Sequence, residues 1–321
     1  MVNVCLIGCG GVGRRHLEAI LKVKHSLNVE VVEPSVVSVN ETKKLLPRFN
    51  NYFSSIDDVS DDIDICVVST TSSVRKDVVL ELVEKKNVKN IILEKVVFQN
   101  ENDFDEVLEL FKDNNIKSWV NCHLRAQPIY NKVKSCLKLY PNTLFNYHYS
   151  DDFTLSTSAI HILDLFSYLC DDYNLKIEKL NIDDELRQSR HSGCVDFNGE
   201  MLVTSGTHTL IVKKKDSVFG EIMTIANTES WIKASEGDNP DLRIGFVDWF
   251  NYRGTHPSHE DIPYIWQSSL TNSYIEDIIE TSDCKLSTLE NSSIIHKTML
   301  RSFKKCLKEK HNREVSDCPI T

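Results

Sequence analysis

The chain has 321 residues, of which 41% are apolar and 26% charged, and its formal net charge is −10. This length and composition are typical of a globular protein with two domains. The acidic balance argues against nucleic acid or an anionic membrane as partner, because both require a basic surface. We therefore expect a small-molecule partner.

The N-terminal sequence Met1–Gly8 is apolar but has no basic leader and no cleavage site. It therefore predicts a buried strand and not a signal peptide. No apolar run is long enough to cross a bilayer. The ten cysteines are scattered, several within apolar strand patterns, and none form a Cys-x-x-Cys pair. We expect reduced thiols, no metal site and a cytoplasmic location.

The first part of the chain alternates short apolar runs with stretches of helical period. Continuous apolar runs predict strands buried on both faces, at residues 2–7, 29–33, 63–69, 91–94 and 117–121. Helices are predicted over 73–86 and 101–111. The buried side of the first helix is expected to carry Val74, Val78, Leu82 and Val83. This alternation predicts an α/β Rossmann domain with a doubly wound parallel sheet over residues 1–121.

The pattern changes after about residue 121. Helices are predicted from Pro128, over 158–170, and at about 263–280 and 288–308. Short strand-like runs, separated by Gly, Asn and Asp, lie at 144–149, 175–180, 194–197, 201–203, 207–212 and 221–226. They predict a second domain over residues 122–321, of α+β type with a mostly antiparallel sheet.

The motif G-x-G-x-x-G follows the first predicted strand and opens a helix. It comprises Gly8, Gly10, Gly11, Val12 and Gly13 with the intervening cysteine. Glycine lets the backbone turn sharply and approach a pyrophosphate, to which the helix N-terminus presents its unpaired N–H groups. In this context the motif predicts a dinucleotide-binding site.

Glu33 follows Gly13 by 20 residues, at the end of the second predicted strand. A carboxylate there accepts hydrogen bonds from ribose hydroxyls and repels a 2′-phosphate, which favours NAD over NADP. Ser69, Thr70 and Thr71 end another strand and face the same crevice. Two interpretations stay open for their hydroxyls: contact with the nicotinamide-side ribose of the cofactor, or capping of the next helix.

Glu94 and Lys95 close a further strand of the predicted sheet. The carboxyl ends of parallel strands face the ligand crevice, so Lys95 is expected there beside the cofactor. A lysine in that place can hold a substrate hydroxyl and stabilise an alkoxide. The alternative is a surface lysine that pairs with Glu94.

Three short motifs, in order along the chain, resemble those of the glucose–fructose oxidoreductase / inositol dehydrogenase / MocA (Gfo/Idh/MocA) family. Glu94-Lys95-Val96 matches two residues of the family's Glu-Lys-Pro motif, and residues 125–128 match its Arg-x-x-Pro motif. Residues 157–164 match Asp-x-x-x-His-x-x-Asp except at the first position. The resemblance implies a Rossmann domain followed by an α+β domain with a large open sheet, and a homodimer or homotetramer built on that sheet.

The resemblance also implies roles for individual residues. Lys95 contacts the reacting hydroxyl, and His161 is the general base that takes its proton; an imidazole suits this task. Arg125 positions the substrate or links the domains. Asp164 pairs beneath the site. His123 lies where the second domain begins and is expected to line the cleft. The cofactor is NAD, and the alternative for His161 is a helix histidine satisfied in the core.

Two positions depart from the family pattern. Val96 replaces the proline, so we expect a trans peptide bond after Lys95. Thr157 replaces the first aspartate and cannot supply a negative charge to orient an imidazolium. It is still counted with Lys95 and His161 among the catalytic residues. The neutral residue favours a nucleotide-activated sugar, as used in surface-polysaccharide biosynthesis, over a free polyol.

Two classes of function stay open. The leading one is an NAD-dependent dehydrogenase acting on a secondary hydroxyl, and a variant of it is an epimerase that keeps NAD bound. The competing class is a non-catalytic NAD-binding or regulatory protein. Separately, His256 and His259 lie in a segment predicted as a solvated loop, with metal binding or substrate contact as alternatives.

Overall fold

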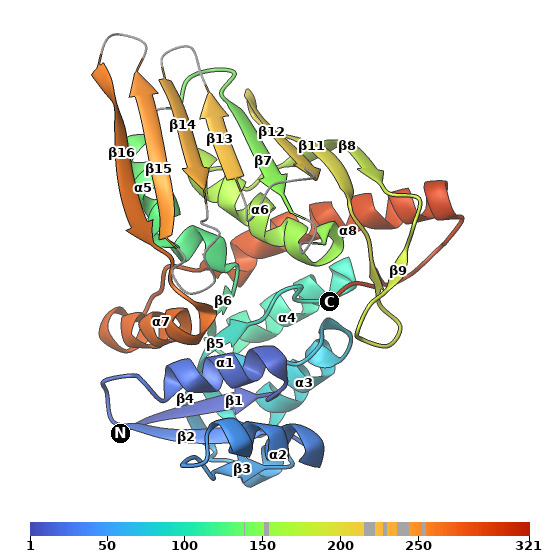
Figure 1. The fold of residues 1–321 in the computed structure, drawn as a ribbon. Coiled ribbons are helices and arrows are strands. Elements are labelled where there is room, and N and C mark those ends of the chain that lie inside the picture. The colour runs from blue at the N-terminus through green and yellow to red at the C-terminus, as the bar shows by residue number, and fades with distance from the viewer. Residues whose placement is uncertain (138, 151–153, 215–221, 227–229, 236–243, 252–254) are drawn as a thin grey trace. The chain divides into compact units, whose positions relative to one another are not determined.

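The computed structural model describes residues 1–321 except 138, 151–153, 215–221, 227–229, 236–243 and 252–254 (Figure 1). The chain divides into two compact units. The first comprises Met1–His123 and Trp266–Glu290, and the second comprises Leu124–Ile265 and Asn291–Thr321. The first break lies two residues beyond the predicted domain boundary.

The first unit contains a seven-stranded sheet in the order β17-β6-β5-β4-β1-β2-β3 (Figure 1). Its neighbouring strands are parallel, except that β17 and β6 are antiparallel. The strands are β1 (Val2–Ile7), β2 (Leu27–Val32), β3 (Tyr52–Phe53), β4 (Asp62–Val68), β5 (Asn87–Leu93), β6 (Lys117–Val120) and β17 (Ser287–Thr288). The order reverses between β1 and β4, so the predicted doubly wound Rossmann sheet is confirmed.

Helices flank this sheet in the chain order that a doubly wound fold requires. They are α1 (Gly11–Ile20), α2 (Val36–Leu45), the 3₁₀ turn η1 (Ile56–Asp58), α3 (Ser72–Lys85), α4 (Glu101–Asp113) and α7 (Gln267–Thr281). The sequence did not predict α2, because its apolar residues Val36, Val37 and Leu45 are exposed and form no buried stripe.

The buried side of α3 differs from the predicted one. Val74 is 45% exposed. The residues of α3 that are buried are Ser72, Arg75, Val79 and Leu82. The prediction is confirmed for Leu82 and wrong for Val74, because it assigned the inner positions to apolar residues only. A guanidinium occupies one of them, and its burial is offset by hydrogen bonds to main-chain carbonyl oxygens.

Helix α7 lies with the first unit, whereas the sequence placed it in the domain 122–321. It packs on α1, where His16 Nδ1 lies 2.7 Å from Thr271 Oγ1. Nearby, the main-chain N–H of Lys24 donates to Glu276 Oε1 at 3.1 Å. An amphipathic pattern shows that a helix has a buried face but not which sheet or helix covers it. The packing of α7 with the first unit could therefore not be predicted from its own sequence.

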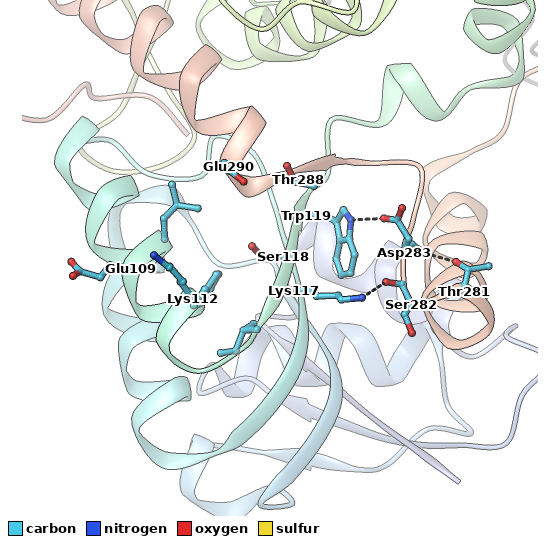
Figure 2. A pocket seen from close by; sticks show the side chains of 13 residues that line it. Glu109, Lys112, Lys117, Ser118, Trp119, Thr281, Ser282, Asp283, Thr288 and Glu290 are labelled. Carbon is cyan, nitrogen blue, oxygen red and sulfur yellow. Dashed lines mark hydrogen bonds between the residues drawn. The ribbon is translucent and has the colours of Figure 1, made fainter.

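The segment after α7 closes the β6 edge of the sheet and lines a cavity of about 760 Å³ (Figure 2). Lys117 Nζ donates to the carbonyl of Ser282 at 3.0 Å, and Trp119 Nε1 donates to Asp283 Oδ1 at 3.2 Å. The remaining lining comes from α4, from β6 and the residue before it, from the end of α7, and from Thr288 and Glu290. None of the glycines or catalytic candidates named above lines this cavity.

The second unit contains an eight-stranded sheet in the order β16-β15-β14-β13-β7-β12-β11-β8 (Figure 1). All neighbours are antiparallel except the parallel pair β12–β7, so the mostly antiparallel sheet is confirmed. The strands are β7 (Leu144–Tyr149), β8 (Lys176–Ile182), β11 (Gly199–Ser205), β12 (His208–Lys214), β13 (Ile222–Ala226), β14 (Ser230–Ser235), β15 (Ile244–Asn251) and β16 (Thr255–Pro263).

Two short strands form a separate ribbon, and helices complete the second unit. The ribbon consists of β9 (Arg187–Gln188) and β10 (Val195–Asp196). The helices are α5 (Pro128–Cys136), α6 (Leu155–Cys170) and α8 (Leu289–His311), with the 3₁₀ turn η2 (His123–Ala126) at the first break between the units. Along β7, Phe145, Tyr147 and Tyr149 are buried and the residues between them are not, so one face of the sheet is covered and the other is accessible.

The segment that contains His256 and His259 forms β16 and not the predicted loop. Pro257 is compatible with a strand here because β16 is an edge strand, where one side makes no ladder hydrogen bonds. The side chains of both histidines lie outside the described residues. Within the described ranges, none of the helices combines the length and apolar character that a bilayer-spanning segment requires.

Candidate active site

Five polar or glycine residues lie in one row at the carboxyl ends of the parallel strands. The strand registers align Ile7 with Val32 and Val68, then Val68 with Leu93, and Leu93 with Val120. The next residues along these strands are Gly8, Glu33, Ser69, Glu94 and Asn121. This edge, where the strand order reverses, is the ligand-binding edge of doubly wound sheets. Motifs that are far apart in the sequence therefore meet at one place.

The glycine turn after β1 is closely packed. Gly8 has φ +89°, a conformation that favours glycine. A Cβ on Gly13 would come within 2.1 Å of the Gly8 carbonyl oxygen, so α1 can start here only without a side chain at that position. Ser69 Oγ donates to the same carbonyl oxygen at 2.6 Å. Ser69 thus holds the turn in shape, and its proposed contact with the cofactor ribose stays a prediction.

Gly10 and Gly11 differ from the other two glycines because they border open space. A Cβ at either position would meet nothing within 4 Å. Gly10 is the N-cap of α1, and no acidic residue lies in the first turn, where Val12 is half-buried. The first N–H groups of the helix and its dipole therefore favour an anion in this space. The arrangement fits the pyrophosphate of a dinucleotide.

Glu33 is held at the end of β2 by two main-chain N–H groups. Its Oε2 accepts from Cys9 at 2.7 Å, and its Oε1 accepts from Ser35 at 2.9 Å. Burial, opposed in part by a hydrogen bond with Thr42, raises the pKa of the Cys9 thiol. The thiol is therefore neutral and adds no charge beside the carboxylate. The carboxylate keeps lone pairs for ribose hydroxyls, as NAD recognition requires.

The loop after β4 contains one buried hydroxyl without a partner. Thr70 Oγ1 is buried and makes no hydrogen bond to any residue that the structure describes. Such a group fits a site that a ligand completes. Thr71 is the N-cap of α3, as one interpretation expected, but its side chain makes no capping hydrogen bond. Its hydroxyl lies 3.3 Å from that of Ser73.

Arg75 joins the two loops that follow β4 and β5. Its side chain is buried and donates to the carbonyl oxygens of Thr70, Val96 and Val97. Burial lowers the pKa of Arg75 to about 10, and the charge of Glu94 opposes the shift, so the guanidinium remains cationic at neutral pH. The residue therefore fixes the backbone on either side of the site, between Thr70 and Lys95.

Glu94 is a buried anion. Its Oε1 accepts from His16 Nε2 at 2.8 Å and from the side-chain amide of Asn121, and its Oε2 accepts from the main-chain N–H of Lys95 at 3.3 Å. Burial alone would raise the pKa of Glu94, but hydrogen bonds from His16 and Asn121 and the charge of Lys95 lower it to about 2. The carboxylate therefore stays ionised throughout the physiological range.

Lys95 follows Glu94 directly and is half-buried. The peptide bond between Lys95 and Val96 is cis, so the trans bond expected from the absence of proline was wrong. His123 lies near both charges. Burial lowers the pKa of His123 to about 4, with Glu94 opposing and Lys95 reinforcing the shift. Its imidazole is neutral at pH 7 and can donate or accept a hydrogen bond to a polar ligand.

Arg125, in the second unit, is enclosed by residues of that unit. Its guanidinium donates to Asp164 Oδ1 at 3.2 Å and to the Tyr173 hydroxyl at 3.1 Å. Its Cζ lies 4.7 Å from the ring centroid of Tyr168. Asp164 is fully buried, so this pair anchors α6, as expected for a residue that pairs beneath a site. Substrate contact by Arg125 stays a prediction.

Thr157 and His161 lie one turn apart on α6 and share one side of the helix. The hydroxyl of Thr157 is 2.6 Å from that of Thr154 and 3.4 Å from that of Ser158. His161 is 8% exposed. Both residues belong to the second unit and Lys95 to the first, so their joint action remains a prediction.

Comparison with known proteins finds a family match for the N-terminal part of the chain. Residues 2–122 match the family model described as an oxidoreductase family with an NAD-binding Rossmann fold, GFO_IDH_MocA. The matched segment contains the parallel strands of the first unit and the glycine turn after β1. The cofactor of this family is NAD, in agreement with the open space at Gly10 and Gly11 and with the anchored carboxylate of Glu33.

Solved Gfo/Idh/MocA-type structures share the fold over nearly the whole chain. An oxidoreductase of Agrobacterium radiobacter, in complex with NAD+, L-tartaric acid and magnesium, has a TM-score of 0.75 and 14% identity, covering 95% of this chain and 96% of that one. UDP-N-acetylglucosamine 3-dehydrogenase GnnA of Acidithiobacillus ferrooxidans has a TM-score of 0.72 and 14% identity, covering 97% and 99%. At these identities the likeness shows the fold alone.

The same fold also occurs in a regulatory protein. The transcriptional regulator Gal80p of Kluyveromyces lactis has a TM-score of 0.68 and 15% identity, covering 96% of this chain and 93% of that one. A comparison with curated protein sequences finds no match.

Because the fold occurs in dehydrogenases and in a transcriptional regulator, it is compatible with catalysis and with regulation. The argument for either function must come from the site.

Three residues of this candidate site were not found from the sequence: His16, Arg75 and Asn121. Asn121 is the last residue of the predicted strand 117–121 and directly follows the observed β6, so its place in the row could have been inferred. His16 and Arg75 lie within helices, and their hydrogen-bond partners are distant in sequence. Among the described residues, no group of three or more His, Cys, Asp or Glu side chains is arranged to hold a metal ion.

Proposed function

We propose that this protein is an NAD-dependent dehydrogenase that oxidises a secondary hydroxyl of a sugar. Lys95 binds the reacting hydroxyl and stabilises the alkoxide that forms. His161 takes the hydroxyl proton as a general base, and Thr157 lies one turn away on the same helix. NAD, when bound, supplies the hydride acceptor.

The observation that carries the proposal is the place of Lys95 in the first unit. It directly follows the row of residues at the ligand edge of the sheet, and Glu94 and Arg75 anchor the backbone on its two sides. The dinucleotide features, Gly10, Gly11 and Glu33, belong to the same edge. A cation held there faces the place where a substrate meets the nicotinamide.

For the substrate we propose a nucleotide-activated sugar of surface-polysaccharide biosynthesis, with a free polyol as the alternative. Thr157 supports this choice, because a neutral hydroxyl stands where the family motif has an aspartate. One structural neighbour is a UDP-N-acetylglucosamine 3-dehydrogenase, which is consistent with this class. His123 and Arg125 are the further candidates for substrate contact.

The test is turnover of the purified chain with NAD and a panel of nucleotide sugars and polyols, followed by nicotinamide absorbance. Lys95→Ala and His161→Ala are each expected to lower kcat about 100-fold or more and to change NAD affinity less than about twofold. Lys89→Ala is the matched control, since Lys89 is exposed on the same strand and pairs with Asp64 at 2.8 Å. Full activity of either alanine variant would refute its assigned role.

A regulatory NAD-binding protein is the second candidate, because Val96 and Thr157 both depart from the catalytic motifs. Tight NAD binding with no turnover of any substrate would favour it. An epimerase is distinguished by a third result. It would convert a nucleotide sugar into its epimer without net change in nicotinamide absorbance, while retaining NAD through purification.

We also propose a cytoplasmic homodimer or homotetramer. The nine described cysteines carry free thiols, which suits a reducing compartment. The accessible face of the second sheet has a depression of about 200 Å³, where Leu202 and Ile211 lie among Lys179, Glu200 and Lys213. Such a mixed face suits association of copies, and light scattering of the purified protein measures the assembly.

A further inference from the structure

A chain of buried polar groups leads from α7 to Lys95 inside the first unit. Thr271 Oγ1 lies 2.7 Å from His16 Nδ1, and His16 Nε2 lies 2.8 Å from Glu94 Oε1. Glu94 Oε2 then accepts from the main-chain N–H of Lys95 at 3.3 Å. Thr271 and His16 are both 0% exposed, and Glu94 is 6% exposed. Three elements, α7, α1 and the end of β5, are therefore joined by buried side chains.

The ionised Glu94 carboxylate determines which nitrogen of His16 donates a hydrogen bond to it. Because the carboxylate is ionised, it needs a donor, so His16 Nε2 carries a proton. Nδ1 then either accepts from the Thr271 hydroxyl, with a neutral imidazole, or donates to it, with an imidazolium. In both cases Thr271 satisfies the second ring nitrogen and fixes the ring with Nε2 toward Glu94. Removing the hydroxyl would leave a buried ring nitrogen without this partner.

The two oxygens of Glu94 act on different sides. Oε1 takes the hydrogen bonds of His16 and Asn121, and Oε2 takes that of the Lys95 main chain. The plane of the carboxylate, and with it the backbone of Lys95, is thus set by the donors on Oε1. The charged or titratable groups around Glu94 are His16 on α1, Arg75 on α3, Lys95 and His123.

We propose that Thr271 is a positioning residue that acts through His16 and Glu94 to hold Lys95. The inference rests on the proposed function in one respect only, the catalytic role of Lys95. Its physical content is that a hydroxyl on α7 determines the orientation of the Lys95 backbone. Buried hydrogen bonds that link several side chains favour one arrangement of the groups they join.

Thr271→Val tests the proposal, since it keeps the shape of the side chain and removes the hydroxyl. Thr271→Ser keeps the hydroxyl, and Thr271→Ala serves as a second hydroxyl-free variant. Thr281→Val is the matched control on the same helix, because the Thr281 hydroxyl is exposed and donates to the Asp277 carbonyl at 2.7 Å. All four proteins retain the full chain.

Two measurements on the cofactor-free protein report directly on the hydrogen bonds that link Thr271 to Lys95. Nitrogen-15 resonances of labelled histidines report the tautomer and partners of His16, and carbon-13 resonances of reductively methylated lysines report the surroundings of Lys95. In Thr271→Val and Thr271→Ala both sets are expected to shift, whereas Thr271→Ser and Thr281→Val match the wild type. With substrate, kcat of Thr271→Val is expected to fall about tenfold, with KM and NAD affinity within about twofold, as for one lost hydrogen bond.

The outcomes separate the two proposals. If the Lys95 resonances of Thr271→Val and Thr271→Ala match the wild type, the inference is wrong, even where the variants unfold at lower temperature. If the wild type turns over no substrate, the proposed function fails, and the Lys95 resonances still decide whether Thr271 acts on Lys95. Equal loss of kcat in Thr271→Ser and Thr271→Val would also contradict the inference.

Discussion

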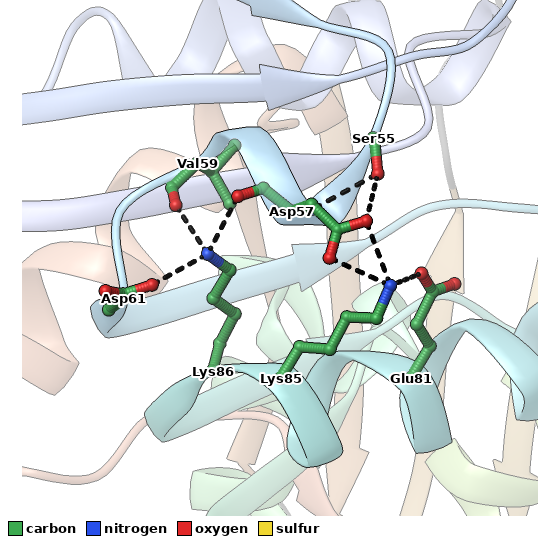
Figure 3. Close-up of polar contacts among 7 residues, drawn as sticks. All are labelled: Ser55, Asp57, Val59, Asp61, Glu81, Lys85 and Lys86. Atoms are coloured by element: carbon green, nitrogen blue, oxygen red, sulfur yellow. Dashed lines mark hydrogen bonds and ion pairs between the residues drawn. The ribbon is translucent and has the colours of Figure 1, made fainter.

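The two ends of the parallel sheet use lysines and carboxylates in different ways. At the amino ends of β4 and β5, Lys86 Nζ donates to the carbonyls of Val59 at 2.7 Å and Asp57 at 3.2 Å, and to Asp61 Oδ1 at 2.9 Å (Figure 3). At the carboxyl ends of the same strands, Glu94 accepts from His16 and Asn121, and Arg75 donates to main-chain carbonyls.

The difference shows which end is built for stability and which for a ligand. At the amino end the charges pair with one another and hold η1 against the start of β5, as the bridge from Lys85 to Asp57 and Glu81 also does (Figure 3). At the carboxyl end the buried charges anchor the backbone, and open space remains beside Gly10 and Gly11. The N-termini of α1, α2 and α3 follow the strands β1, β2 and β4 at this second end, which explains why an anionic cofactor fits there.

The largest expected effect is that of Arg75→Met. It leaves the buried carbonyl oxygens of Thr70, Val96 and Val97 without this donor, so the free energy of unfolding is expected to fall by about 3 kcal/mol or more. Turnover is expected to fall with it, because the loops on both sides of the site lose their common anchor. Urea unfolding and the nicotinamide assay measure the two effects.

Arg75→Lys keeps the charge but offers fewer donors in a different geometry, so an intermediate loss is expected. It also provides a folded protein if the methionine variant fails to fold. Wild-type stability and turnover in both variants would show that Arg75 does not anchor the site.

Glu94→Gln tests the carboxyl end of the sheet through the pH dependence of the unfolding free energy. The pKa of Glu94 is about 2 in the fold, below its ordinary value. Between the ordinary pKa of a glutamate and about pH 2, the unfolded chain therefore binds up to one more proton than the folded chain. The stabilisation by the Glu94 carboxylate is complete above the ordinary pKa and is lost as the pH falls toward 2. Relative to Glu94→Gln, the unfolding free energy of the wild type is expected to fall by about 1.4 kcal/mol per pH unit between roughly pH 4 and pH 3.

Urea titrations at several pH values measure this slope, and Asp57→Asn is the counterpart at the amino end. Asp57 is exposed, and its pKa is lowered by hydrogen bonds from Lys85 and Ser55. Its substitution is expected to change the slope much less than that of Glu94. Parallel curves for wild type and Glu94→Gln would contradict the buried-anion interpretation.

Lys86→Met tests whether the amino end of the sheet contributes to stability but not to turnover. The variant removes the donor to two carbonyls and one carboxylate while keeping an apolar stem, so a loss of about 2 kcal/mol is expected with kcat unchanged. Lys85→Ala is expected to cost much less stability than Lys86→Met, because the ion pairs of Lys85 are exposed. A clear drop in kcat for Lys86→Met would show that the two ends are coupled.

The smallest expected effect on stability belongs to Gly11→Ala. A Cβ there meets only open space, and alanine favours a helix, so unfolding should be unchanged or slightly harder. NAD affinity should fall about tenfold, because the methyl group occupies the space offered to the pyrophosphate. Gly13→Ala provides the contrast: its Cβ would lie 2.1 Å from the Gly8 oxygen and should destabilise the protein without cofactor. Calorimetric titration with NAD measures the affinity.

Much of the fold was predictable because its signals are local. Continuous apolar runs identified β1, β4, β5 and β6, and the alternation with helices gave the doubly wound order. Three kinds of element were missed for physical reasons: β3 is two residues long, α2 exposes its apolar residues, and β16 contains an edge proline that was taken as a sign of a loop. Short or exposed elements depend on their neighbours and not on their own pattern.

The candidate site was predicted in part. Motif spacing located Gly8 to Gly13, Glu33 and Lys95 at one edge of the sheet, and the registers place the first residue after each strand in one row there. The spacing did not show that Ser69 binds the glycine turn, nor that a cis bond follows Lys95. Both depend on contacts between segments that the sequence separates.

By itself, the sequence determined the parallel sheet, the change of pattern after residue 121, and the glycine and acidic residues of a dinucleotide site. These follow from periodicity and from the conformational freedom of glycine, which are local properties. Only the tertiary structure decided that residues 266–290 return to the first unit, and that His16, Arg75 and Thr271 surround Glu94 and Lys95. Buried polar side chains are stabilised by partners that folding brings together, and no local pattern names those partners.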